Sequence, residues 1–233
     1  MSINSIIIYF ETKFQQKKHT TMKKVSVLTL AFILTASFTV FAQGGRKDVD
    51  VKGDFTSIGI GIPAQVYLMK GPAKVEAEGP EKALSEIKYE VEKGELRINN
   101  KNRNGWNKNF KGVILYITMP EVKGISIAGS CDVMGKDAFE NQGDLEISIA
   151  GSGELKLAGS GKNIKISIAG SGDVDLSAFN GNKCSVDIAG SGDAKVGEME
   201  SLDVSIAGSG DVRYKGSTKV NSSIAGSGDV EKM

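Results

Sequence analysis

An eight-residue word that recurs six times constrains the fold of this chain more than any other feature. The word reads Ser-Ile-Ala-Gly-Ser-Gly-Asp-Val with small changes, and successive copies begin 22, 19, 20, 18 and 18 residues apart. A short period that stays nearly constant indicates structural units that stack on one another. The copies are Ser126–Val133, Ser148–Leu155, Ser167–Val174, Asp187–Ala194, Ser205–Val212 and Ser223–Val230.

One period contains short strands separated by corners. Apolar residues alternate with polar ones over Ile164–Ile168, which is typical of a strand with one buried face. Gly170-Ser171-Gly172 follows, and its two glycines tolerate the positive φ that a tight corner needs. Alternation resumes over Val174–Leu176, a turn follows at Asn180-Gly181-Asn182, and Cys184–Ile188 repeats the first pattern.

The constant lap favours a parallel β-helix over a meander of hairpins, because the same corner returns after each lap. We therefore predict an all-β fold: a parallel, right-handed β-helix with repeats of 18–22 residues. At one strand spacing per lap, five laps would rise roughly 25 Å. In the last lap Ser222 takes a core position between Val220 and Ile224, which predicts a polar end that resists edge pairing.

Residues 44–120 lack the repeat, and we predict that they form a β-rich cap or the first laps. Strands are expected over Phe55–Leu68 and Val113–Met119, and a hairpin over Tyr89–Ile98 with Lys93-Gly94 at its turn. Pro80 should begin a short helix that runs over Glu81–Ile87. This region should share the core of the repeats.

The N-terminus carries export signals. Met22-Lys23-Lys24 begins a basic start, an apolar run of about 16 residues follows, and Val40-Phe41-Ala42 fits a signal peptidase site. The run is short for a membrane span, which needs roughly 20 residues. We therefore interpret 22–42 as a signal peptide, 1–21 as a spurious upstream extension, and 43–233 as a single domain. A retained anchor is the alternative.

Charge and histidine content exclude several classes of function. The whole chain has 29 basic and 28 acidic residues, and cleavage after Ala42 would remove five lysines and one glutamate, for a net charge near −3. Nucleic-acid binding needs a strongly basic face, so it is not expected. The single histidine, His19, also lies in the segment that would be removed, which excludes Ser-His and Cys-His catalysis and His-containing zinc sites.

Cys131 and Cys184 would remain in an exported protein, where disulfides are common. Cys131 replaces the second corner glycine of the first copy, whereas Cys184 aligns with Ile164 three laps later. Three strand spacings separate these levels by roughly 14 Å, and a disulfide needs Cα atoms within about 7 Å. We predict that the two cysteines are not bonded and that Cys184 is buried.

Two sets of residues are candidates for ligand contacts. A polar loop at Asn99–Asn109 carries Trp106, Arg103 and Asn104, which could stack on a sugar or anchor a partner; the alternative is that Trp106 folds back onto its own loop. The corner acids Asp173, Asp193, Asp211 and Asp229 could hold calcium ions. Alternatively they accept hydrogen bonds from corner amides and face water, which we favour because their spacing does not fit the calcium-binding nonapeptide. We expect no cofactor and no metal.

Several segments together resemble a known family. They are Gly53–Ile58, Gly94–Ile98, the strand that ends in Met119-Pro120, and the Ala-Gly-Ser-Gly-Asp corners. Over residues 48–232 the chain resembles the putative auto-transporter adhesin, head GIN domain family of Bacteroidetes-type bacteria. The resemblance implies a β-helical fold, an envelope or secreted location and, through the family's name, adhesion; it brings no catalytic residues. Cys131 departs from the corner glycine of the pattern.

These observations indicate a non-enzymatic, exported cell-envelope protein that acts as an adhesin-like binding module. It would reside in the periplasm, at the cell surface or outside the cell, and bind a glycan or a surface protein. An envelope scaffold or a stress-sensing module with a membrane partner is the alternative. A polysaccharide-acting enzyme is a third possibility, although such sites need a cleft with clustered acids and bases, and these corners are minimal.

Overall fold

The computed structural model describes residues 45–102 and 110–233. The predicted upstream extension and signal peptide therefore lie outside the described residues and stay predictions. Among the helices that are described, none is long and apolar enough to cross a membrane.

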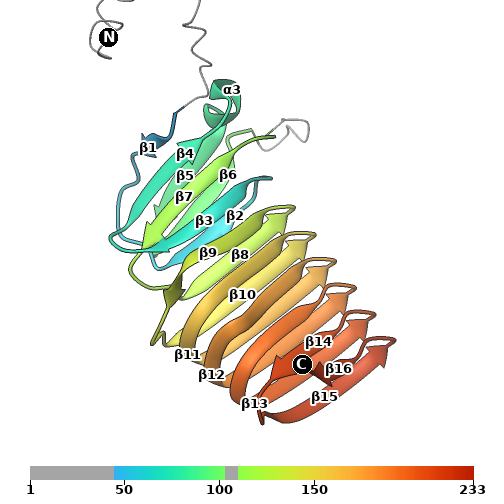
Figure 1. Cartoon of the computed structure of the whole chain (residues 1–233). Helices are drawn as coiled ribbons and strands as arrows, with labels where there is room; N and C mark the ends of the chain where they lie inside the picture. The colour runs from blue at the N-terminus through green and yellow to red at the C-terminus, as the bar shows by residue number, and fades with distance from the viewer. Residues whose placement is uncertain (1–44, 103–109) are drawn as a thin grey trace, which may run out of the picture. The chain divides into compact units, whose positions relative to one another are not determined.

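Strands are the main secondary structure of the described chain, and they belong to one coiled sheet (Figure 1). The short helix is α3 (Glu81–Leu84). The sixteen strands are β1 (Lys47–Val49), β2 (Ser57–Ile60), β3 (Gln65–Lys70), β4 (Lys74–Glu78), β5 (Ile87–Glu92), β6 (Glu95–Asn100), β7 (Ile114–Met119), β8 (Gly124–Gly129), β9 (Asp132–Phe139), β10 (Asp144–Gly151), β11 (Glu154–Gly170), β12 (Asp173–Gly190), β13 (Ala194–Gly208), β14 (Val212–Lys215), β15 (Lys219–Gly226) and β16 (Val230–Lys232).

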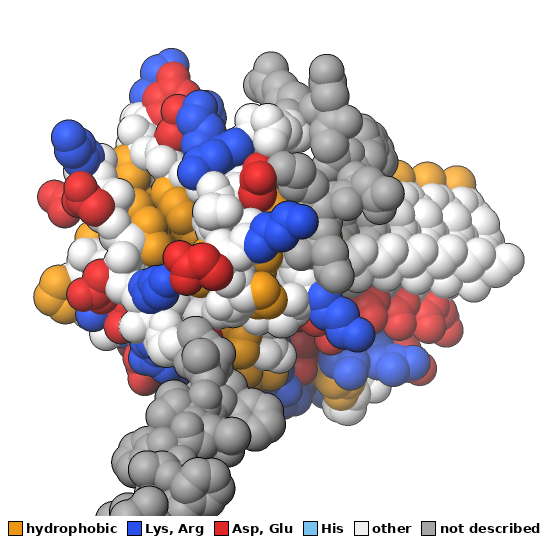
Figure 2. Space-filling view, turned by 90° about the horizontal axis from the view of Figure 1, so that it is seen from above, with side chains coloured by type: hydrophobic (Ala, Val, Ile, Leu, Met, Phe, Trp, Pro, Cys, Tyr) orange, Lys and Arg blue, Asp and Glu red, His pale blue; other side chains and the backbone are white. Residues whose placement is uncertain are grey.

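The copies of the repeated word stack in parallel and in register. Ser148 pairs with Ser126 on one side and with Ser167 on the other, and the series continues through Asp187 and Ser205 to Ser223. Like residues therefore lie over like residues, and Figure 2 shows the outer side chains aligned in rows along the laps. The predicted parallel β-solenoid is confirmed.

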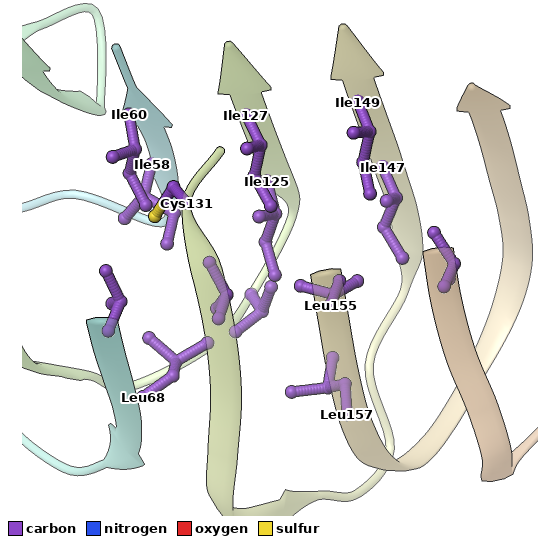
Figure 3. Packing of buried hydrophobic residues seen from close by; sticks show 14 of the residues in the cluster. Ile58, Ile60, Leu68, Ile125, Ile127, Cys131, Ile147, Ile149, Leu155 and Leu157 are labelled. Atoms are coloured by element: carbon purple, nitrogen blue, oxygen red, sulfur yellow. The ribbon is translucent and has the colours of Figure 1, made fainter. Parts of the chain in front are cut away.

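Each lap has two arms whose apolar side chains meet in the middle. In Figure 3, Ile147 and Ile149 of β10 lie across the core from Leu155 and Leu157 of β11. All four are at most 2% exposed. One continuous cluster of buried side chains extends from the N-terminal strands to β14, so the laps stabilise one another through a shared core.

Lap length varies because residues are inserted outside the arm that carries the Ser-Ile-Ala part of each word. The arm that carries the Ser-Ile-Ala part of each word pairs without a break from β8 to β15. The other arm carries the register shifts: one residue separates Lys156 from Ala158, whereas three separate their partners Met134 and Ala138. The longest lap has three more residues than the next one, 22 against 19, and two of the three form a bulge in β9.

The two glycines of each corner have different functions, which corrects the prediction that both supply a positive φ. Gly170 has a φ of +128°, but Gly172 does not lie in the left-handed region. Gly172 is required for close approach instead, since a Cβ there would lie 2.7 Å from the carbonyl oxygen of Gly153 in the lap below. Cys131 occupies the equivalent place in the first copy with its side chain fully buried, above a corner built around Pro63.

The N-terminal strands begin the solenoid and then close it. β2 and β3 pair in parallel with β8 and β9, whereas β1, β4 and β5 add antiparallel strands. The predicted hairpin is confirmed, with Lys93 and Gly94 at φ values of +52° and +79°. The helix is shorter than predicted and ends at Leu84, because Ile87 is buried and pairs with Asn100 as the start of β5.

The C-terminal lap is covered on one side only. β15 pairs with β13 alone, and Ile224 is 40% exposed although the equivalent Ile206 is 1% exposed. Ser222 is exposed at this end of the stack. Its place in the strand pattern suggested a core position, but its hydroxyl is solvated.

Candidate functional site

A groove crosses the outer face of the arm that carries the repeated word. It encloses about 730 Å³, and its floor consists of the serines and alanines of five successive words, from Ser126 to Ala207, with Asp187 in place of one serine. Glu95, Arg97 and Asn99 of β6 line its N-terminal end. The floor is flat because its side chains are short and the strands are in register. Such a surface can contact an extended partner over several laps.

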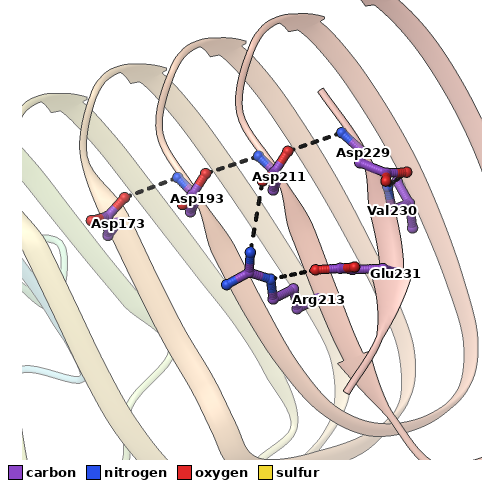
Figure 4. A network of polar contacts seen from close by, with 7 residues as sticks. All are labelled: Asp173, Asp193, Asp211, Arg213, Asp229, Val230 and Glu231. Carbon is purple, nitrogen blue, oxygen red and sulfur yellow. Dashed lines mark hydrogen bonds and ion pairs between the residues drawn. The ribbon is translucent and has the colours of Figure 1, made fainter. Parts of the chain in front are cut away.

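The corner acids form a ladder on the other arm (Figure 4). The backbone N–H of Asp193 donates to Oδ1 of Asp173 at 2.9 Å, that of Asp211 to Asp193 at 2.9 Å, and that of Asp229 to Asp211 at 3.0 Å. Each carboxylate thus accepts the corner amide of the next lap. These three contacts are hydrogen bonds from corner amides of the kind expected for the corner acids; that the ladder binds no calcium stays a prediction.

Basic residues lie beside this ladder. Nε of Arg213 is 2.8 Å from Oε1 of Glu231, and a guanidinium nitrogen is 3.9 Å from Asp211. Within 45–102 and 110–233, no group of three or more His, Cys, Asp or Glu side chains converges as a metal site would require. Asp173, Asp193 and Asp211 accept the corner amide of the following lap, and Asp229 accepts the N–H of Val230.

The candidate contacts Trp106, Arg103 and Asn104 lie outside the described residues and stay predictions. The two cysteines are described: both are free, and burial raises the pKa of each thiol to about 12. A thiol with such a pKa carries little thiolate at neutral pH, so neither cysteine is a competent nucleophile.

The sequence analysis missed an aromatic pair on the outer face of the N-terminal laps. The ring centroids of Tyr67 in β3 and Tyr116 in β7 are 5.4 Å apart, with an angle of 38° between the ring planes. Nζ of Lys136 lies 4.0 Å from the Tyr67 centroid, and Cζ of Arg46 lies 3.4 Å from the Tyr116 centroid. Both cations are within the distance of a cation–π interaction.

A sequence signal for this pair exists. Tyr67 stands between the buried Val66 and Leu68, and Tyr116 stands between the buried Leu115 and Ile117, so alternation places both rings on the outer face. That the two rings are neighbours depends on the pairing of β3 with β7, which could not be read from the sequence.

The fold and these surfaces define a class of protein: a parallel β-solenoid that presents long, regular outer faces. Within that class, the chain belongs to the family described as putative auto-transporter adhesin, head GIN domain, which matches residues 54–218.

Solved structures with the same fold come from Bacteroides and Parabacteroides. A protein described as a putative adhesin from Bacteroides fragilis aligns with a TM-score of 0.62 and 21% identity, over 81% of this chain and 96% of that chain. A protein described as a putative lipid binding protein from Parabacteroides distasonis aligns with a TM-score of 0.53 and 22% identity, over the same shares of the two chains. At these identities the likeness establishes the fold alone. No curated protein sequence matches the chain.

Proposed function

We propose that this chain is a non-enzymatic, exported cell-envelope protein that acts as an adhesin-like binding module. The observation that carries the proposal is the groove of about 730 Å³, whose floor repeats the same short side chains over successive laps. Membership of a family of putative adhesins supports it. The partner would be an extended molecule, either a glycan or a protein on another surface.

The floor of the groove is suited to binding because it is already ordered. Each inner strand of the stack is hydrogen-bonded to a strand on both sides, and serine and alanine lose little side-chain entropy when a partner covers them. A partner strand or glycan chain could therefore make many small contacts without rearranging the protein.

The groove offers little for catalysis. Glu95 is held by Arg97 at 2.8 Å, and Asp187 is the acidic residue that the repeats bring to the floor. General acid–base cleavage of a polysaccharide needs two carboxyl groups placed across the scissile bond. This arrangement supports binding over turnover.

Protease treatment of intact cells tests the location, and an adhesion assay tests the groove. We expect intact cells to lose the protein to the protease, and the variant Ala169→Arg, which fills the exposed floor, to lower adhesion to host cells or matrix. The matched control is Ser171→Arg, an equal charge change at an exposed corner outside the groove lining. Protection in intact cells, with digestion only after lysis, would instead support the envelope scaffold or stress sensor.

A further inference from the structure

We propose that the outer face around Tyr67 and Tyr116 is a binding site for acidic saccharides. This proposal rests on the binding function proposed above. We call Tyr67, Tyr116 and Met134 the tyrosine platform. It lies on the arm that carries the aspartate ladder and is separate from the serine and alanine groove.

The platform is one row of the sheet. Tyr116 of β7 pairs with Tyr67 of β3, and Tyr67 pairs with Met134 of β9, so three large side chains point outward next to one another. Met134 is 41% exposed, which is unusual for a large apolar residue in this chain. In the later laps the same row carries charged residues: Lys156, Asp175, Lys195 and Arg213.

The rings are held in place from below and from the side. Their strands are paired on both sides, and the residues flanking each tyrosine are buried in the core. The hydroxyl of Tyr116 donates a hydrogen bond to Oε2 of Glu78 at 3.2 Å. A rigid aromatic surface with polar atoms at its edge is what stacks on the apolar C–H face of a pyranose ring.

Lys136 reaches the platform because of the bulge in β9. The longest lap inserts two of its additional residues between Met134 and Ala138, and Lys136 and Asp137 project there. The carboxylate of Asp137 accepts the backbone N–H of Lys70 at 3.0 Å and anchors the bulge to β3. The irregular 22-residue spacing of the first two words thus places a cation over Tyr67.

The charges over the rings lack strong partners. Lys136 is exposed and contacts the Tyr67 ring and the Met134 sulfur, at 3.4 Å from Nζ. In the part of the chain that the structure describes, no carboxylate lies within ion-pair distance of Lys136. Arg46 has a carboxylate, on Glu76, only at 3.9 Å. Because Glu76 pairs with Tyr116 in the same row, an anionic group on a ligand would complement Lys136 and would compete with Glu76 for Arg46.

This arrangement selects an acidic saccharide over a neutral one. A neutral sugar must displace a cation from the ring face and offers that cation no ionic partner in return. A carboxylate or sulfate on the ligand draws the ammonium or guanidinium away from the ring, and the exposed face then becomes available to the sugar. An acidic saccharide can therefore pair with the cation and stack on the ring that the cation has left, whereas a neutral saccharide cannot do both.

Titration calorimetry on the protein purified from its export compartment tests the site. The probes are trigalacturonate, sialyllactose and a sulfated heparin tetrasaccharide, against lactose and maltotriose as neutral controls. We expect Kd values below about 1 mM for at least one acidic probe and at least about tenfold weaker binding of the neutral ones. Tyr67→Ala should weaken the acidic ligand by about tenfold or more, whereas Tyr67→Phe retains the ring and should bind nearly as well as the native protein.

Lys136→Ala should remove most of the preference for the acidic ligand. Lys195→Ala is the matched control, since Lys195 is exposed in the row of Met134, three strands further along than β9, and its loss changes the net charge equally. Far-UV circular dichroism and the Tm should stay native for every variant. The proposal is overturned if no acidic probe binds at about 10 mM, if neutral probes bind equally well, or if correctly folded Tyr67→Ala binds like the native protein.

The groove variant separates this inference from the proposed function. Ala169→Arg should leave saccharide affinity unchanged, because Ala169 lies in the groove on the other arm. Saccharide binding by a protein that does not support adhesion would refute the adhesin function alone. Adhesion that persists in Tyr67→Ala, with no saccharide bound by the native protein, would refute the platform alone.

Discussion

Replacement of the second corner glycine by alanine tests the stacked-corner architecture directly. A Cβ at Gly192 would lie 2.1 Å from the carbonyl oxygen of Gly172 and 2.8 Å from the Cγ2 methyl of Ile168. Contacts shorter than 3.0 Å are not found for real Cβ atoms, so the corner would have to rise by about 1 Å. That movement would stretch the bond from the N–H of Asp193 to Asp173 and the bond from the N–H of Ser191 to Gly170, which measure 2.9 and 2.8 Å.

The expected loss of stability follows from these contacts. Forced overpacking costs about 1–3 kcal/mol, and each lost backbone hydrogen bond adds about 1 kcal/mol. Gly192→Ala should therefore lower the free energy of unfolding by about 3–5 kcal/mol. Urea denaturation followed by far-UV circular dichroism measures this quantity.

Gly143→Ala is the matched control, because a Cβ at Gly143 would meet no atom within 4 Å and its φ is not in the left-handed region. Its unfolding free energy should stay within about 0.5 kcal/mol of the native value. If Gly192→Ala also stays within about 1 kcal/mol, close approach between corners does not limit this position and the reasoning fails.

Four further predictions follow from the core, the corners and the N-terminus. Cys184→Ser should lower the free energy of unfolding by about 1–3 kcal/mol, because it buries a hydroxyl between Ile164 and Leu202; an unchanged urea midpoint would contradict this. Burial raises the pKa of the Cys184 thiol to about 12, so at high pH the folded chain keeps a proton that the unfolded chain loses. The stability that this group contributes is therefore complete below the ordinary thiol pKa and is lost as the pH rises towards 12. The urea midpoint of Cys184→Val should accordingly fall less steeply with rising pH than that of the native protein. A chelator should leave the Tm within about 2 °C of its starting value, and a fall of more than about 10 °C would show dependence on a metal. N-terminal sequencing of the exported protein should begin at Gln43, and any start upstream of it would refute cleavage after Ala42.

The repeat made most of the fold predictable. Alternation and corner glycines determine which residues of each lap are buried, and the buried Ile164, Ile166 and Ile168 lie as predicted. The predicted helix length was wrong because Ile87 pairs with Asn100 in a strand and does not continue the helix before it. Whether strand pairing or helix propensity prevails at such a residue cannot be read from the local sequence pattern.

The binding surfaces were less predictable than the fold. A lap of 22 residues is visible in the sequence, but its additional residues could have left the stack at any corner, so the position of Lys136 could not be deduced. The groove could not be foreseen either, because small side chains become a floor only when Arg97 and Asn99 of a non-repetitive strand stand at its end.

Every register shift lies on one arm, so insertion of residues on that arm does not interfere with the addition of laps to the stack. The uninterrupted arm keeps each lap interchangeable with its neighbours, so duplication of a lap would lengthen the molecule by about 4.8 Å and present the same edge again. The bulged arm can meanwhile accept new residues, as the lap with Lys136 and Asp137 has done, while the core side chains of the uninterrupted arm stay in register. A lineage of such proteins could therefore vary its reach and its specificity independently, and the bulge in β9 is the natural place to graft a foreign binding loop.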